Sequence, residues 1–573
     1  MLFNQFLPLE ELKKSFDDDE WDSLNTLLDT FLTHDKKSDH VLRNNKLLGE
    51  IHHSANLDKY ASKTFRKNLF ETVPQSEKER YFQYCGIKEK ISTITFDKLT
   101  KNIDEVIGFD WGDNKETRRF LNYCNLPEYL IPDKSLEMKK QETVYGGYKN
   151  YQEEKFEELQ MLHGYQSSII HKTLRLLEAP NCKCLIQMPT GTGKTRVAME
   201  ILAYVLNQNP SARIIWLTNK HELLEQAHDA FVRLWNHVGK FQANVLNIWL
   251  GGKVSNISKG GVLIFSSYGI LNNLLDDGLD FKADYVFIDE AHQMLAPTFN
   301  YAISKISSTS ENETRIIGLT ATPGRGIDED QNILFVQEFH GKIIGIEFDE
   351  TEKIYKGKPL QYLEDDGVLA KTIPYPLYTD YEFNLSKDEW KDLARLSTKT
   401  GDHNEFDERS FKKMANDNVR NILIIRKLKE FVEEGKKILY FSTTKNQSLM
   451  IFTVLQQLGI KAIHVSGETD RGFRRQINKK FKDTDEIDII CNYDIFATGF
   501  DVPKLDVVFI ARPVNSPVLF NQMVGRGTRG PKMGGTPTHT LVQVIDKKPS
   551  RFVGFDPYRQ YGFWDSKWKS ANE

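Results

Sequence analysis

The chain has 573 residues, 40% of them hydrophobic and 27% charged, and its formal net charge is −4. This composition is that of soluble domains, and the length corresponds to roughly three to four of them. Five cysteines, no apolar run of 18 residues and no leader pattern exclude a disulfide-built or membrane-spanning protein. We therefore expect a cytoplasmic protein without a membrane partner, in which any nucleic-acid surface is a local groove.

The first 150 residues are rich in helix signals and are expected to form a helical accessory domain, residues 1–150. Within it, residues 58–91 and 97–130 align without gaps at an offset of 39 and share eight identical positions. Self-similarity of this kind predicts two copies of a small helical unit, with a more diverged third copy near residues 19–57.

Two local patterns mark helix starts in this domain. Ser76 and Glu79 have the capping-box spacing, which predicts the N-terminus of a helix. The acidic cluster at residues 16–22 is interpreted as a solvated helix start that complements the helix dipole, in preference to a metal site.

From residue 151 onward, apolar strand-like runs alternate with helical stretches in two series. Such alternation is typical of parallel sheets, whose strands are buried on both faces. We predict an α/β fold with two parallel-sheet lobes, residues 151–340 and 341–550, before a C-terminal tail, residues 551–573. Strands are expected at 184–188, 213–217, 262–266, 285–289 and 315–319 in the first lobe, and at 343–348, 378–385, 438–442, 462–465, 487–491, 506–510 and 540–544 in the second.

A phosphate-binding loop, Met188-Pro189-Thr190-Gly191-Thr192-Gly193-Lys194-Thr195, follows the first of these strands and opens a helix. Glycines let backbone N–H groups approach phosphate oxygens, and the helix N-terminus adds partial positive charge. Lys194 can neutralise the β- and γ-phosphates, and the Thr195 hydroxyl can ligate Mg²⁺. Met188 stands where the strict pattern has glycine. The loop predicts a nucleoside triphosphate site formed by Thr190, Gly191, Thr192, Gly193, Lys194 and Thr195.

Two carboxylates, Asp289 and Glu290, follow another predicted strand of the same lobe, in the tetrad Asp289-Glu290-Ala291-His292. Side chains at the C-terminal ends of parallel strands lie beside the phosphate loop. We expect Asp289 to hold Mg²⁺ and Glu290 to orient and deprotonate the attacking water.

This tetrad after a phosphate loop resembles the DEAH box of superfamily 2 helicases and nucleic-acid translocases, and further motifs follow in the family's order. Those in the first lobe resemble the Q motif (Leu162, Tyr165, Gln166), motif Ia (from Thr218), the next strand-tracking segment (Ser266-Ser267-Tyr268) and motif III (Thr320-Ala321-Thr322-Pro323). Those in the second lobe resemble motif IV (Phe441-Ser442-Thr443), motif V (ATGFDVP, 497–503) and motif VI (QMVGRGTR, 522–529). With Ala511-Arg512-Pro513, they are most similar to the branch that contains type I restriction motor subunits.

The resemblance implies RecA-like lobes, ATP and Mg²⁺ as cofactors, and nucleic acid as the partner, with DNA favoured over RNA. It assigns adenine recognition to Gln166 and further nucleotide contacts to Gly499 and Asp501. Catalytic roles beside that of Glu290 fall to Gln522, Arg526 and Arg529, and coupling roles fall to His292, Thr320 and Thr322. The resemblance assigns contacts with nucleic-acid phosphates to Thr218, Ser267, Thr443 and Thr498.

Spacing gives Arg526 a role that does not depend on the family. It lies 237 residues beyond Asp289 (526 − 289), so it must reach the phosphates from the other lobe. A guanidinium there acts as an arginine finger, and closure of the lobes then gates hydrolysis.

We therefore expect an ATP hydrolase that moves along or unwinds nucleic acid, as a helicase or translocase in an anti-phage or DNA-processing complex. The alternative is an ATP-gated sensor or assembly module that recruits a protein partner through residues 1–150. These residues contain no convincing Asp…Glu-x-Lys nuclease pattern, so cleavage is not expected of this chain.

Overall fold

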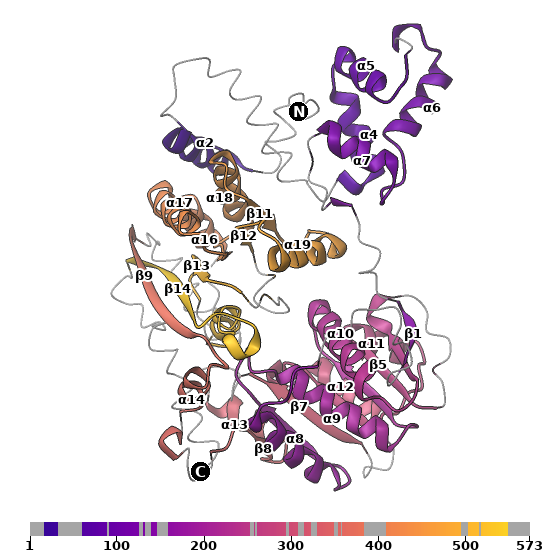
Figure 1. Cartoon of the computed structure of the whole chain (residues 1–573), viewed down its shortest axis with the longest axis vertical. Coiled ribbons are helices and arrows are strands. Elements are labelled where there is room, and N and C mark those ends of the chain that lie inside the picture. The colour runs from indigo at the N-terminus through magenta and orange to yellow at the C-terminus, as the bar shows by residue number, and fades with distance from the viewer. Residues whose placement is uncertain are drawn as a thin grey trace.

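The structure, a computed structural model, contains two α/β lobes and a group of helices formed by N-terminal residues (Figure 1). The predicted fold class is confirmed, because each lobe is built on a sheet whose strands are parallel or nearly all parallel. Along the described part of the chain, no helix combines the length and apolar character needed to cross a membrane. The structure describes residues 16–32, 60–88, 91–124, 126, 130–131, 139–145, 159–251, 257, 260–293, 297–307, 314–321, 329–348, 353–356, 358–382, 408–493, 495, 502, 504–514 and 517–547.

The first lobe contains an 8-stranded sheet in the order β1-β4-β5-β3-β6-β7-β2-β8. Only β1 runs antiparallel to its described neighbour, β4. The strands are β1 (Gln141–Val144), β2 (Lys183–Gln187), β3 (Arg213–Leu217), β4 (Ala243–Asn247), β5 (Val262–Ser266), β6 (Tyr285–Ile288), β7 (Arg315–Thr320) and β8 (Ile343–Ile344). Its helices are α8 (Gly164–Leu177), α9 (Lys194–Gln208), α10 (His221–Val238), α11 (Tyr268–Asp276), α12 (Pro297–Ile306), α13 (Glu329–Glu338) and α14 (Pro359–Asp365).

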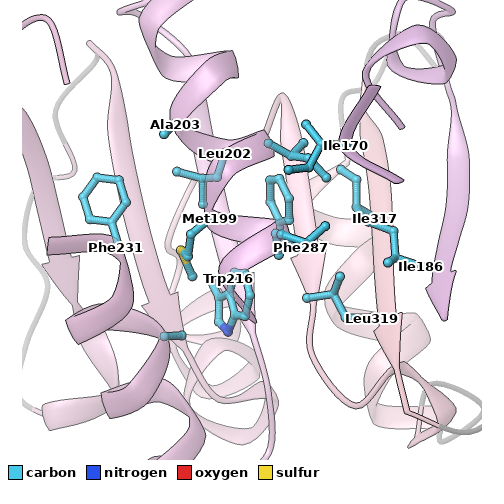
Figure 2. Close-up of a cluster of buried hydrophobic side chains, with 14 of the residues drawn as sticks. Ile170, Ile186, Met199, Leu202, Ala203, Trp216, Phe231, Phe287, Ile317 and Leu319 are labelled. Atoms are coloured by element: carbon cyan, nitrogen blue, oxygen red, sulfur yellow. The ribbon is translucent and has the colours of Figure 1, made fainter. Parts of the chain in front are cut away.

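Helices α8, α9 and α10 share a hydrophobic core with one face of this sheet. Figure 2 shows Met199 and Leu202 of α9 beside Trp216, Phe287 and Ile317 of the strands. The apolar strands predicted from the sequence are therefore buried because helices cover them. Since β2 and α9 are both anchored in this core, the loop between them is held in place.

The second lobe contains a 6-stranded sheet in the order β11-β12-β10-β13-β14-β9, with every described pair parallel. Its strands are β9 (Lys371–Glu382), β10 (Ile438–Phe441), β11 (Ala462–Val465), β12 (Ile489–Asn492), β13 (Val507–Ile510) and β14 (Thr538–Lys547). Its helices are α16 (Glu408–Ala415), α17 (Asn418–Glu433), α18 (Lys445–Gln457), α19 (Arg471–Asp483) and α20 (Pro517–Val524). Side chains of α17 and α18 pack in one core of the sheet, and those of α19 and α20 pack in the other.

The boundary between the lobes lies later than the sequence indicates. β8 pairs with β2 of the first sheet, and Ile344, Leu363 and Leu369 are buried in the core of the first lobe. The second sheet begins with β9 at Lys371. The boundary is therefore near residue 370 and not at 341, because a short apolar run does not reveal which sheet it joins.

Four N-terminal helices form a module with an aromatic core: α4 (Lys63–Thr72), α5 (Gln75–Tyr84), α6 (Phe96–Val106) and α7 (Lys115–Cys124). The second helices of the two predicted repeats start 40 residues apart (115 − 75), but the first helices start only 33 apart (96 − 63). The offset of 39 therefore describes α5 and α7 and not α4 and α6. The matched rings of Tyr84 and Tyr123 lie 5.0 Å apart, so equivalent faces of α5 and α7 meet.

The predicted capping box at Ser76 is wrong. α5 begins at Gln75, with Pro74 as its N-cap, so Ser76 lies inside the first turn. The ring of Pro74 holds φ at −56°, close to the helical value, and starts the helix without a side-chain cap.

Arg66 is a buried side chain that links several backbone segments of the module. Its guanidinium donates to the backbone carbonyls of Tyr60, Ala61, Ile107 and Phe109, and it lies 4.4 Å from the centroid of the Phe109 ring. Burial lowers the pKa of Arg66 to about 10. This side chain joins α4 to the segment that follows α6.

Helix α2 (Asp18–Leu32) packs on the second lobe, where Leu24, Leu27 and Leu28 share a core with α17 and α18. Its acidic residues form a helix start, as interpreted: the N–H groups of Asp17 and Glu20 each donate to the other's carboxylate at 3.0 Å. The predicted third repeat lies beyond Leu32 for most of its length, outside the described residues.

Candidate functional site

The phosphate loop connects β2 to α9, as the sequence predicts. Gly191 and Gly193 adopt φ values of +86° and +83°, a conformation that glycine takes without steric cost. Met188 is buried, and its N–H donates to the Thr320 carbonyl at 3.0 Å, which continues the β2–β7 pairing. An apolar side chain therefore suits this position better than the glycine of the strict pattern.

Lys194 lies between the two carboxylates predicted to join it. Its Nζ is 3.3 Å from Asp289 Oδ1 and 3.4 Å from Glu290 Oε1, and its side chain is 12% exposed. Burial alone would lower the pKa of Lys194, but Glu290 and Asp289 outweigh burial and raise it. Lys194 is therefore a fixed cation at the floor of the loop.

The carboxylate of Glu290 is held ionised in a buried site. Burial alone would raise the pKa of Glu290, but Lys194 and other nearby cationic groups lower it. The others are His292, whose Nδ1 is 3.3 Å from Glu290 Oε2, and Arg526 of the second lobe. For Asp289, burial prevails over Lys194 and raises the pKa.

The backbone of Glu290 is itself unusual, because a non-glycine residue there has a φ of +53°. Its N–H donates to Asp289 Oδ1 at 3.0 Å, which fixes the turn after β6. Strained backbone of this kind clusters at functional sites. The two carboxylates are thus presented side by side at the end of the strand, in positions set by the fold.

Gln166 lies at the start of α8, against the phosphate loop. Its amide nitrogen donates to the Thr192 carbonyl at 3.0 Å, and its amide oxygen accepts from the N–H of His163 at 2.9 Å. Each end of the amide keeps capacity for one further hydrogen bond. Tyr165, which the sequence reasoning left without a role, also donates to the Thr192 carbonyl, at 2.8 Å.

The second lobe reaches the phosphate loop through motif VI. The Thr528 hydroxyl donates to the Gly525 carbonyl at 3.1 Å, and its Oγ1 also lies 3.5 Å from the Thr190 carbonyl. A Cβ on Gly525 would lie 2.5 Å from the Thr190 Cβ, so this approach requires glycine. Arg526 follows directly, and its Nε donates to the Gln522 carbonyl at 3.2 Å.

The segment before β9 completes this contact. Leu369, from the core of the first lobe, forms a β-bridge with Arg529, and the Ala370 N–H donates to the Thr528 carbonyl at 2.8 Å. The structure therefore places Arg529 beside the phosphate loop and Arg526 within electrostatic reach of Glu290. The sequence reasoning missed Thr528 and Leu369; the position of Thr528 inside motif VI was a signal, whereas nothing marked Leu369.

The remaining nucleotide and coupling residues are only partly described. Thr320 is buried at the end of β7, where its carbonyl pairs with the phosphate loop, and His292 lies beside Glu290. The predicted residues that lie outside the described part of the chain are Thr322, Thr498, Gly499 and Asp501.

The predicted nucleic-acid contacts have different surroundings. Thr218 follows β3, and its hydroxyl is buried without a hydrogen-bond partner among the described residues. Ser267 caps α11 by accepting from the Ile270 N–H at 3.5 Å. Thr443 is 1% exposed, and its hydroxyl donates to the Ala511 carbonyl at 3.2 Å. Thr218 therefore has hydrogen-bonding capacity to offer a phosphate, whereas Ser267 and Thr443 serve local structure.

The residues present fit a triphosphate with Mg²⁺. Two glycines with positive φ and the N-terminus of α9 form the phosphate cradle, and Thr195 and Asp289 supply oxygen ligands of the kind that Mg²⁺ prefers. Within the described ranges, no group of three or more His, Cys, Asp or Glu side chains forms a cage for a metal.

Two family models match the chain. Residues 160–325 match "Type III restriction enzyme, res subunit", and residues 421–530 match "Helicase conserved C-terminal domain". A 51.5 kDa protein of a Lactococcus phage is 26% identical over 60% of this chain and 62% of its own length. The EcoKI endonuclease subunit, a type I restriction enzyme subunit of Escherichia coli K12, is 22% identical over 74% of this chain and 37% of its own length. DEAD-box ATP-dependent RNA helicase 51 of Arabidopsis thaliana is 27% identical over 37% of each chain.

These matches support a helicase of superfamily 2, close to the branch that contains the restriction-enzyme motor subunits. ATP and Mg²⁺ are the usual cofactors of such helicases. The chain spans between 37% and 62% of the lengths of these three relatives.

Proposed function

We propose that the chain is an ATP hydrolase that couples closure of its two lobes to movement along nucleic acid or to its unwinding. The observation that carries the proposal is the composite site: motif VI of the second lobe contacts the phosphate loop of the first, and Lys194, His292 and Arg526 together lower the pKa of Glu290 against the effect of burial. A site divided between lobes changes when they move, so hydrolysis and movement are coupled.

In this proposal Lys194 binds the β- and γ-phosphates, and Thr195 and Asp289 hold Mg²⁺, which neutralises charge on the phosphates. Glu290 orients the attacking water and accepts its proton, because its carboxylate is ionised and fixed by the turn after β6. Arg526, with Gln522 and Arg529 beside it, stabilises charge on the γ-phosphate. Gln166 selects the base through the free capacity of its amide.

Nucleic acid is the proposed partner, and DNA is favoured because restriction enzymes are among the relatives. The same likenesses, together with the relative from a phage, support a place in anti-phage defence or DNA processing in the cytoplasm. RNA is the competing substrate, because an RNA helicase is also among the relatives.

A second candidate function is an ATP-gated sensor that recruits a protein partner through its N-terminal residues. It is favoured by the module of α4 to α7, whose aromatic core is part of a buried cluster shared with the second lobe. A motor and a sensor both hydrolyse ATP on nucleic acid. Only the motor displaces a third strand from a DNA triplex.

ATP turnover should be measured with single- and double-stranded DNA and RNA, at low and high salt. We expect DNA to stimulate turnover more than RNA, and we expect the stimulation to fall with salt because phosphate contacts release counterions. Triplex displacement on the best substrate then separates motor from sensor. Turnover that responds to none of the four nucleic acids contradicts both candidate functions, and stimulation by RNA alone contradicts the DNA preference.

A further inference from the structure

Two ion pairs join the lobes away from the phosphate loop, between α10 of the first lobe and α19 of the second. Arg475 Nε is 2.8 Å from Glu225 Oε2, and the neighbouring Arg474 guanidinium contacts Glu222. The four side chains are between 13% and 26% exposed. Water screens such pairs less than it screens surface pairs, so their geometry constrains how the lobes sit.

The N-terminal segment meets the same two helices. On α19, the amide nitrogen of Gln476 donates to the Ile131 carbonyl. On α10, His228 contacts Glu142 of β1, the strand that adds to the edge of the first sheet. The segment therefore contacts α19 of the second lobe at residue 131 and α10 of the first lobe at residue 142.

Helices α10 and α19 each share a buried core with residues of the ATP site in their own lobe. On the second-lobe side, Ile477 of α19 shares one buried cluster with Leu130 of the N-terminal segment and with Met523 and Val524 of α20. Arg526 follows Val524 by two residues. A shift of α19 is therefore transmitted through packed side chains to Arg526, because close-packed cores move as units.

The first-lobe side is connected in the same way. Leu224 and Ala227 of α10 share a buried cluster with Met188 and Val197, which flank the phosphate loop. The junction of α10 with α19 thus bears on both halves of the site, the loop in one lobe and the arginine in the other.

We propose that Glu225 and Arg475, braced by the N-terminal segment at Ile131 and β1, are positioning residues that set the distance between Arg526 and Glu290. The inference rests on the proposed role of Arg526 in hydrolysis. It gives the N-terminal residues a task within the ATPase cycle, in which they hold α19 against α10. A partner that binds these residues acts on hydrolysis through α19.

The test compares Glu225→Arg, Arg475→Glu and the double exchange in the full-length chain. Each single change places like charges at the junction, and the double exchange restores an opposite pair. Turnover is measured as kcat and KM for ATP, and the lobe separation by electron spin resonance between nitroxide labels at Tyr204 and Val419. Both label positions are exposed, at 50% and 62%, and they lie on α9 and α17.

Each single change is expected to lengthen or broaden the label distance and to lower kcat on the order of a hundredfold, as misplacement of about 1 Å does elsewhere. KM should change less than kcat, because the phosphate loop is anchored between β2 and α9 in the core of the first lobe, whereas Arg526 reaches the site from the second lobe. The double exchange should restore both distance and kcat. Glu486→Gln is the matched control, because it removes a carboxylate paired with Lys480 of α19 inside the second lobe, and it should leave both readouts unchanged.

Gln476→Ala tests the brace without introducing charge, and it should broaden the distance distribution. If the label distances in the single charge variants equal those of the wild type, Glu225 and Arg475 do not position the lobes. The same conclusion follows if the double exchange fails to restore the lost kcat. Unchanged distances in Gln476→Ala overturn the bracing role. If the wild type hydrolyses no ATP, the proposed function fails, whereas the distances still show whether the junction sets the lobe separation.

Discussion

Lys194→Ala is expected to weaken ATP binding by roughly ten- to a hundredfold, since hydrogen bonds to charged groups contribute about 1.5–3 kcal/mol. It should also abolish measurable turnover, because the phosphate loop then no longer neutralises charge on the β- and γ-phosphates. The substitution removes the cation that lies 3.3 Å from Asp289 and 3.4 Å from Glu290, so two buried carboxylates are left facing each other. Equilibrium titration with a fluorescent ATP analogue measures the first effect, and steady-state kinetics the second.

The same change should lower the free energy of unfolding by about 3–5 kcal/mol, the cost of leaving a buried charge without its partner. Denaturant unfolding therefore has to accompany the binding measurement. Lys172→Ala is the matched control, because Lys172 pairs with Glu347 at the surface of the same lobe. Wild-type ATP affinity in a folded Lys194→Ala protein contradicts the assignment of the loop.

Glu290→Gln is expected to retain ATP binding and to lower kcat by about 10²- to 10⁴-fold. Glutamine has the shape of glutamate, so the contact with Lys194 survives through the amide oxygen, but an amide does not accept a proton at neutral pH. The carboxylate is ionised in the protein because the nearby cationic groups prevail over burial. Single-turnover hydrolysis at saturating ATP isolates this effect from binding.

Glu200→Gln controls for the loss of one carboxylate in the first lobe. Glu200 lies on α9, where it accepts hydrogen bonds from Arg196 at 2.7 and 2.9 Å. The Glu200→Gln protein should hydrolyse ATP at a rate close to that of the wild type. Near-normal turnover in Glu290→Gln would show that Glu290 is not the base and that another group accepts the proton of the attacking water.

Elements defined by local pattern were predictable from the sequence. The strand at 184–188 appears as β2 (Lys183–Gln187), and the helix expected after the loop appears as α9. The phosphate loop and the acidic pair were predictable together, because parallel strands bring their C-terminal ends to one edge of the sheet. Arg526 was predictable as a residue of the other lobe from its distance along the chain.

Features that depend on long-range contacts were not predictable. The sequence indicates a lobe boundary at 341, because nothing local shows that β8 pairs with β2. The predicted start of α5 at Ser76 was displaced by Pro74, whose ring fixes the backbone on its own. The sequence does not show the partners of Arg474 and Arg475, which the fold places against Glu222 and Glu225 of the other lobe.

The central claim is that one ATP site is built from both lobes, and Arg526→Ala tests it most directly. The measurement is the rate of ATP hydrolysis at saturating ATP and nucleic acid, with ATP binding measured in parallel. We predict a rate about 10³- to 10⁵-fold below that of the wild type with ATP binding largely retained, the effect of removing an arginine finger. A rate close to that of the wild type would show that the second lobe does not take part in the chemistry, and would contradict the account.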